Sequence, residues 1–281
     1  MSGGAAPVAS APAASPRGVG GFRIALGVLA VFALAAVVAP LVAPVSQEAM
    51  DLGARRAPPS FAHWFGTDEL GRDVLARVVH GARVSLAIGL FSAALAVALG
   101  SAIGAVGGFV GGWVDGALMR LTDAMLAIPR LPFLMIVAAI LQPSIPLLIV
   151  LVGAAGWMET GRVVRAEVLS LVSRGFVEAA RASGVAERGI LSTHILPNVW
   201  GTIAVSATLA VGRGILLESA LSFFGVGVQP PAASWGNMLY QAQTTLTSEP
   251  WLAIFPGLAI FTSVLCVNVA GEHLAASERD A

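Results

Sequence analysis

Long apolar runs alternate with shorter polar stretches along the chain. A helix needs about 20 apolar residues to cross about 30 Å of hydrocarbon. The runs that meet or approach this length predict an all-α polytopic membrane protein. The predicted spans are 24–43, 84–107, 118–141, a run that follows Pro146 and ends near Trp157, 199–221 and 251–269.

The third predicted span is interrupted by charges and prolines. If it began only after Arg130, about eleven residues would remain before Leu141, too few to cross the bilayer. We therefore expect one continuous helix over 118–141 that includes the polar residues. Glycine pairs at 107–108 and 111–112 predict a turn before it.

Two polar stretches flank the first predicted span. Residues 1–21 are mostly Ala, Pro, Ser and Gly, a composition that predicts a disordered tail. Within 45–83, Thr67 is expected to cap an amphipathic helix that lies on the membrane surface, with Asp68 and Glu69 in its first turn. Leu70, Val74 and Val78 would then form its apolar face at four-residue spacing.

Composition supports a membrane protein and excludes one kind of site. Hydrophobic residues make up 57% of the 281 residues and charged residues 11%, against about 25% charged in soluble domains. Every basic residue is arginine. Because a phosphate-binding P-loop needs lysine, the chain cannot carry that motif, and any ATP must be hydrolysed by a partner.

Candidate metal and redox chemistry is sparse. Cys266 is the single cysteine, so no disulfide can form within the chain. The four histidines show no paired-ligand spacing. We expect no metal site, no cofactor and no catalytic residue.

Asp123, Arg130, Arg213 and Glu218 are ionisable residues that fall inside predicted spans. A charge near the bilayer centre costs at least about 2.5 kcal/mol, so such groups usually face a pore or a partner. Arg213 and Glu218 are five residues apart and point to different faces of a helix. We hypothesise that the four border a translocation path. The alternative for the arginines is pairing with Asp123 or reaching an interface.

The longest basic polar interval after position 84 is 173–197, SRGFVEAARASGVAERGILSTHILP. It predicts two short helices, over 176–183 and from about 186 towards His194, joined at Gly184 in a left-handed conformation. Pro197 is expected to end the second helix. Ile190, Leu191 and neighbouring apolar residues would leave one face in need of a cover.

This interval resembles the EAA loop of membrane subunits of ATP-binding-cassette importers. Glu178, Ala179, Ala180, Gly184 and Pro197 carry the resemblance. The string His194-Ile195-Leu196-Pro197-Asn198 is similar to the form in the oligopeptide, dipeptide and nickel branch, and Phe65 to Asp73 resembles the second-type permease of that branch.

The resemblance implies a type I importer permease fold. Its parts would be a first transmembrane helix at 22–44, an extracytoplasmic loop at 45–83, a five-helix core at 84–270 and a cytoplasmic tail at 271–281. A cytoplasmic elbow at 173–197 would dock on an ATPase. The implied coupling residues are Glu178, Ala179, Ala180, Gly184, Val185, Ile190, Leu191 and Pro197.

The implied function is a non-catalytic permease half in a bacterial inner membrane. Its expected partners are a homologous permease, two cytoplasmic ATPase subunits and an extracytoplasmic solute-binding protein, with no nucleic acid. The arginine distribution favours both termini in the cytoplasm. The solute would be a di- or oligopeptide; nickel, glutathione and opines stay open, as does the rival class of ion-gradient-driven secondary transporters.

Overall fold

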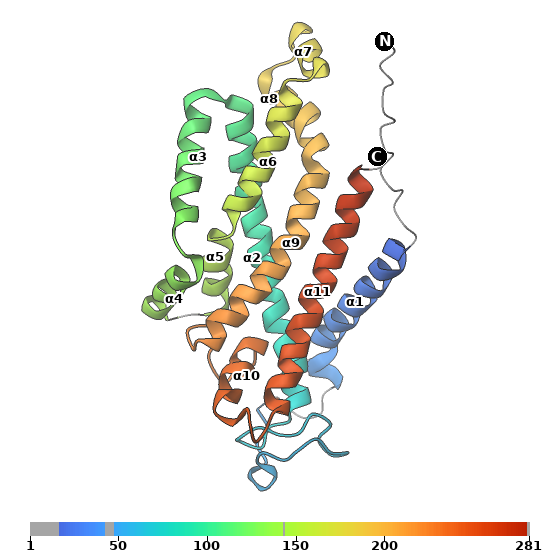
Figure 1. Ribbon diagram of the computed structural model, residues 1–281, viewed down its shortest axis with the longest axis vertical. Helices are drawn as coiled ribbons and strands as arrows, with labels where there is room; N and C mark the ends of the chain where they lie inside the picture. The colour runs from blue at the N-terminus through green and yellow to red at the C-terminus, as the bar shows by residue number, and fades with distance from the viewer. Residues whose placement is uncertain (1–16, 43–47, 143, 280–281) are drawn as a thin grey trace, which may run out of the picture.

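The described residues, 17–42, 48–142 and 144–279 of the computed structural model, form a bundle of helices, with a long loop before α2 and shorter connections elsewhere (Figure 1). They contain one isolated antiparallel bridge, between Thr67 and Asp73. The main helices are α1 (Arg17–Val42), α2 (Val74–Val110), α3 (Gly112–Ala127), α4 (Arg130–Leu141), α5 (Ile145–Ala154), α6 (Trp157–Val172), α7 (Gly175–Ala182), α8 (Glu187–Gly189), α9 (Leu196–Phe223), α10 (Trp235–Ala242) and α11 (Trp251–Arg279); the short turns are η1 (Leu52–Ala54), η2 (Ile190–Ile195) and η3 (Gln243–Thr245).

By length and composition, three described helices can cross a membrane: α2, the continuous helix Glu187–Phe223 and α11. Two bent pairs, α3 with α4 and α5 with α6, raise the number to five if each pair is one span. In α1 the described apolar stretch is the shorter Gly20–Ala35. A multi-pass helical protein is therefore confirmed, whereas six crossings stay a prediction.

The third predicted span is broken, so the expectation of one continuous helix was wrong. The axes of α3 and α4 differ by 81°. Ile128 adopts an extended conformation, with ψ 125°, immediately before Pro129. Proline disfavours helical geometry in the residue before it, and here that local preference decides the break.

The fourth span does not end near Trp157. Trp157 begins α6, which continues to Val172 after a bend of 40° between α5 and α6. The charged residues that follow Trp157 suggested the end of a span. They are helical nonetheless, and Glu159, Arg162 and Arg165 pair with residues of other helices, as described below.

No interfacial helix starts at Thr67. Gly66 and Gly71 have φ values of 75° and 74°, and the segment between them folds as a loop. The Asp68 carboxylate accepts the backbone N–H groups of Leu70 and Arg72 and so stabilises a turn instead of a first helical turn. Asp73 is the actual N-cap, and α2 runs unbroken from Val74 through the turn expected at 107–108.

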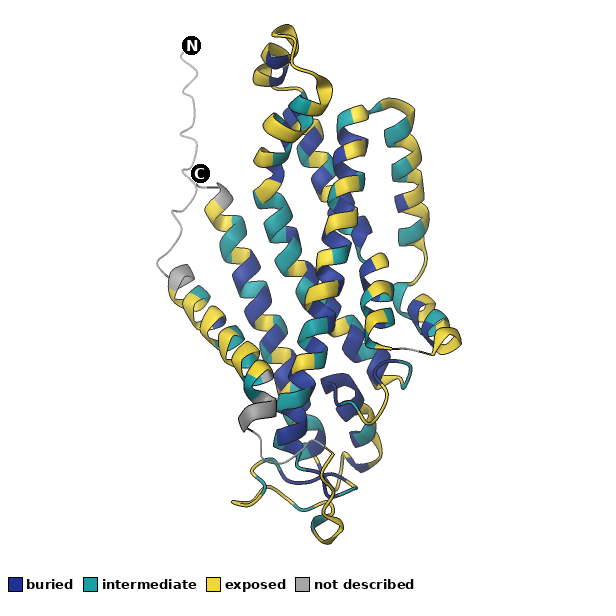
Figure 2. Ribbon diagram, turned by 180° about the vertical axis from the view of Figure 1, so that it is seen from behind, coloured by how far each residue is buried: buried dark blue, intermediate teal, exposed yellow. Residues whose placement is uncertain are grey.

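Glycine sets how closely α2 packs on its neighbours. Gly100, Gly104 and Gly108 recur every four residues on α2, and a Cβ built on Gly104 would lie 2.4 Å from the Gly161 carbonyl oxygen of α6. On the other flank, a Cβ on Gly214 of α9 would lie 2.9 Å from the Gly89 carbonyl oxygen. Small residues let helices approach closely in lipid, so α2 packs tightly against both α6 and α9. Figure 2 shows the buried residues gathered where the helices of the bundle face one another.

The ends of the chain are more helical than predicted. Residues 17–21 belong to α1, and α11 continues through 271–279 where a tail was expected; residues 1–16 lie outside the described part. Phe22 stacks on His273 with ring centroids 4.3 Å apart. This contact and the packing of α1 on α11 order both ends.

The bundle has two distinct ends. α7 projects at one end, and α11 finishes on the same side of the bundle, whereas α10 and the loop before α2 close the opposite end; α1 begins about midway along the bundle (Figure 1). We call these the elbow end and the loop end.

Candidate coupling elbow and intramembrane charge cluster

The elbow begins with α7, which ends where glycine was predicted. Gly184 has φ +80°, and the Val185 N–H bonds the Ala180 carbonyl oxygen at 3.1 Å while the Gly184 N–H bonds that of Arg181 at 3.0 Å. This hydrogen-bond pattern is the Schellman motif. The predicted left-handed glycine and the first short helix are confirmed.

Pro197 does not end the second helix of the elbow, as had been predicted. α8 passes into a π-helical turn, η2, and then into α9, so that Glu187–Phe223 is one continuous helix. Pro197 lies in the first turn of α9. Within the continuous helix this proline follows directly on the wider π turn, where the regular hydrogen-bond ladder is already interrupted and a missing N–H is tolerated.

Part of the apolar face of the elbow is used within the chain itself. Val177, Ala180, Ile190 and Ile195 are buried against a cluster from α6 that includes Val168. Ile190 is fully buried, so it offers no surface to a partner in this conformation. The exposed residues among those predicted for coupling are Glu178, Ala179, Gly184, Val185 and Pro197, and Leu191 is half-buried.

An exposed ion pair fixes the angle of the elbow. The Arg181 guanidinium donates to both carboxylate oxygens of Glu187, at 2.9 and 3.2 Å. This hydrogen bond raises the pKa of Arg181, with a smaller opposing effect from burial. The two helices on either side of Gly184 are thus joined by charge as well as by backbone.

The structure brings Arg130 and Arg213 together on a residue that the sequence had not singled out, Glu159. Arg130 Nη2 lies 3.0 Å from Glu159 Oε1, and Arg213 Nη1 bonds Glu159 Oε2. The side chains are 22%, 38% and 37% exposed for Arg130, Arg213 and Glu159. We call these three residues the charge cluster.

Two cavities adjoin the charge cluster. One of about 10 Å³, room for about one water molecule, is lined by both arginines together with Ser92 of α2 and Gly214 of α9. The other, of about 260 Å³, is apolar and is lined by Arg130 with residues such as Met125, Phe133 and Met158. Arg130 therefore lies between a small niche, which it shares with Arg213, and a larger apolar space.

Glu159 belongs to a row of charges along α6. Arg162 pairs with Asp123, and Arg165 pairs with Asp115 through Nη2 and Oδ2 at 2.6 Å. The spacing of Glu159, Arg162 and Arg165 at every third residue puts them on one helix face. That periodicity was the signal in the sequence that could have found Glu159.

Glu218 lies apart from the other predicted path residues. It is fully buried, and its carboxylate accepts hydrogen bonds from the hydroxyls of Ser85 and Ser222 at 2.9 and 2.8 Å and of Ser219 at 3.4 Å. The Ser85 hydroxyl oxygen also accepts a hydrogen bond from the backbone N–H of Trp235. Glu218 thus holds α2, α9 and the start of α10 together at the loop end.

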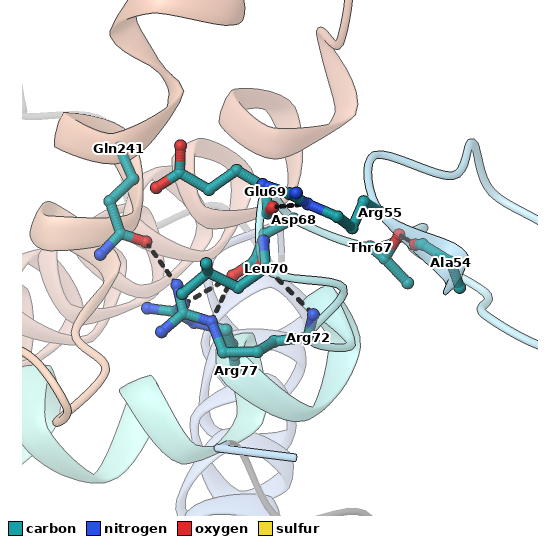
Figure 3. Close-up of polar contacts among 9 residues, drawn as sticks. All are labelled: Ala54, Arg55, Thr67, Asp68, Glu69, Leu70, Arg72, Arg77 and Gln241. Carbon is teal, nitrogen blue, oxygen red and sulfur yellow. Dashed lines mark hydrogen bonds and ion pairs between the residues drawn. The ribbon is translucent and has the colours of Figure 1, made fainter. Parts of the chain in front are cut away.

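A second pair of arginines shares a carboxylate at the loop end (Figure 3). Asp68 Oδ2 lies 2.7 Å from both Arg72 Nε and Arg77 Nη1, and Asp68 Oδ1 accepts two backbone N–H groups. Arg72 reaches Gln241 of α10 at 3.4 Å. The side chains of Asp68, Arg72 and Arg77 are at most 10% exposed. We call them the loop network.

Similarity to known proteins agrees with this architecture. Residues 83–280 match the family described as "Binding-protein-dependent transport system inner membrane component", and residues 21–59 match "N-terminal TM domain of oligopeptide transport permease C". The first match covers the helices from the second predicted span onward.

Individual relatives extend the likeness over most of the chain. A putative peptide permease protein of Brucella suis biovar 1 is 41% identical over 237 residues, which are 84% of this chain and 78% of the relative. The dipeptide transport system permease protein DppC of Alkalihalophilus pseudofirmus is 38% identical over 251 residues, 89% of this chain and 83% of the relative.

The family match excludes the alternative of an ion-gradient-driven secondary transporter. In binding-protein-dependent systems, solute is taken up through a permease that works with separate ATPase and solute-binding partners. A helical bundle with several membrane-crossing helices, an exposed elbow and charges inside its spans fits that task. The chain belongs to the inner membrane component family of binding-protein-dependent transport systems and is a multi-pass permease subunit, not an enzyme.

Proposed function

We propose that this chain is one of two homologous permease subunits of an ATP-driven importer of short peptides. The names of its relatives support the solute class. The observation that carries the rest is the elbow: a rigid, charge-braced turn at one end of the bundle whose outer surface includes Glu178, Ala179 and Val185.

The elbow is suited to transmit movement. Its inner face packs on α6, and its second limb continues without interruption into the membrane-spanning α9. A force on α7 or α8 therefore acts on both α6 and α9. We propose that two cytoplasmic ATPase subunits supply this force, one on this elbow and one on that of the companion permease.

The elbow end is proposed to face the cytoplasm. α11 ends toward the elbow end, and the start of α1 is nearer that end than its last residues are (Figure 1), which supports the proposal that both termini are cytoplasmic. The loop end would then meet the extracytoplasmic solute-binding protein.

The companion permease is proposed to cover the face that carries the charge cluster. Arg213 lies about 25 Å along α9 from Leu196 and about 15 Å from Phe223, by helical rise, and is 38% exposed. Exposure of such a charge to lipid is costly. We propose that Asp123, Arg130 and Arg213 border the path between the two permeases, and that Glu218 reaches it only if α10 separates from α2.

The test is co-purification and uptake. A tagged chain purified from its native membrane should retain a second permease and two P-loop ATPases. Gly184→Leu forces a branched side chain into a left-handed conformation at a cost of about 1–2 kcal/mol, although a Cβ there meets no atom within 4 Å. We expect it to abolish ATP-coupled peptide uptake with membrane insertion unchanged.

Matched variants separate backbone geometry from contact. Gly184→Asn should keep more uptake than Gly184→Leu, because asparagine tolerates this conformation. Glu178→Ala should release the ATPases, whereas Arg188→Gln, on the same elbow and exposed, should not. Normal peptide uptake by Gly184→Leu, or a chain that purifies alone and transports without ATP, would refute the proposal.

A further inference from the structure

The charge cluster has an excess of one positive charge. Arg130 and Arg213 share the single carboxylate of Glu159, each through one of its two oxygens. A guanidinium has five N–H donors, and in the described part of the chain the bond to Glu159 uses one on each arginine. Charge and hydrogen-bonding capacity for a second anion are therefore present within a predicted membrane span.

The cluster is also accessible. All three side chains are between 22% and 38% exposed, and both arginines line the small niche beside Ser92. An apolar cavity of about 260 Å³ begins at Arg130. A ligand with a carboxylate next to an apolar group would satisfy both surroundings at once.

We infer that the two arginines form a binding site for the carboxylate of the transported solute, and that Glu159 is the resident carboxylate that this group displaces. A free peptide C-terminus has the required chemistry, because arginine binds carboxylates through paired N–H donors. The inference rests on the proposed peptide function and adds to it a specificity-determining site.

Glu159 provides a mechanism for release of the bound solute. As a carboxylate covalently held beside both arginines, it competes with the solute and takes its place when the solute leaves. A site without Glu159 should hold the solute more tightly and turn over more slowly. An ion pair that serves only to hold α4, α6 and α9 together predicts the opposite, a looser site when Glu159 is changed.

The experiment uses the co-purified importer in lipid nanodiscs, without binding protein or nucleotide. The binding of radiolabelled trialanine and of its C-terminal amide is measured for the wild type and for Glu159→Gln. If one competing charged hydrogen bond is removed, we expect Glu159→Gln to bind trialanine about tenfold more tightly and the amide no more tightly. Arg213→Gln should lose the preference for the free carboxylate.

Controls identify the source of any effect. Asp115→Asn removes another carboxylate that faces an α6 arginine, Arg165, away from the cluster, and should leave trialanine binding unchanged. Acetate should raise the melting temperature of Glu159→Gln, because a ligand that binds the folded state stabilises it, and this tests the anion site independently of the solute.

Several results would overturn the inference. Equal or weaker trialanine binding by Glu159→Gln would show a structural ion pair, or a site filled by a carboxylate of the companion permease. Equal tightening for the amide would show a change in cavity shape instead of carboxylate recognition. A wild-type importer that takes up no peptide at all would instead refute the proposed function, and the acetate result would still decide whether an anion site exists.

Discussion

The loop network and the charge cluster are built from the same parts, two arginines on one carboxylate, yet their surroundings differ. Asp68 accepts four hydrogen bonds, two from arginine side chains and two from backbone N–H groups. Glu159 has one arginine on each oxygen. The loop network is at most 10% exposed, whereas Glu159 is 37% exposed.

This difference distinguishes a carboxylate that stabilises the fold from one that can take part in solute binding. A buried carboxylate with every lone-pair direction occupied fixes a loop and leaves no room for another ligand. A half-exposed carboxylate with few partners can be exchanged for a similar group. Arginine content alone therefore does not identify a transport site; the saturation and exposure of the shared carboxylate do.

The largest expected effect is from Asp68→Asn. It leaves Arg72 and Arg77 buried without their counter-charge, and removal of one partner from a buried ion pair costs about 3–5 kcal/mol. We expect a much lower melting temperature in detergent. Glu69→Gln, at the neighbouring exposed position, is the control. An unchanged melting temperature for Asp68→Asn would contradict the structural role of the loop network.

A smaller effect is expected when arginine is replaced by lysine at each site. Arg72 bridges Asp68 and Gln241 through different nitrogens, which a single ammonium cannot reproduce, so Arg72→Lys should cost about 1.5–3 kcal/mol for a charged hydrogen bond. Arg130 makes one such bond, and Arg130→Lys should unfold close to the wild-type temperature. Equal losses of stability in Arg72→Lys and Arg130→Lys would contradict the contrast between the loop network and the charge cluster.

The smallest effect on stability is expected from Glu159→Gln. Partly exposed ion pairs are worth about 0–1 kcal/mol, so the melting temperature should fall only slightly. Acetate should restore it, because a ligand that binds the folded state stabilises it. The same acetate concentration should not rescue Asp68→Asn, whose site is closed to solvent. If acetate rescued both variants, or neither, the two sites would not differ in their access to solvent anions.

The elbow shows how far local sequence signals extend. Gly184 was placed correctly because a left-handed helix terminus is a property of one residue and its neighbours. The predicted stop at Pro197 failed because the π turn before it and the packing of Ile195 on α6 continue the helix. A similar limit explains Thr67, whose capping role was overruled by the turn at Asp68.

The charge cluster was only half visible in the sequence. Arg130 and Arg213 stood out because charges are rare in apolar runs, but Glu159 lay in a polar stretch where carboxylates are ordinary. Their meeting depends on the break at Pro129 and on the close approach of α2 to α6 and α9 at glycines. Glu218 stood out for the same reason as the arginines and proved to be held by serines instead.

By itself, the sequence determined the class of the protein, the positions of most apolar helices, the absence of a P-loop and the glycine hinge of the elbow. These follow from composition, run length and single-residue conformational preference, which act locally. Only the tertiary structure decided which charges meet and which apolar residues of the elbow stay free. Those features depend on contacts between residues distant in the chain, and local propensity yields wherever such contacts are stronger.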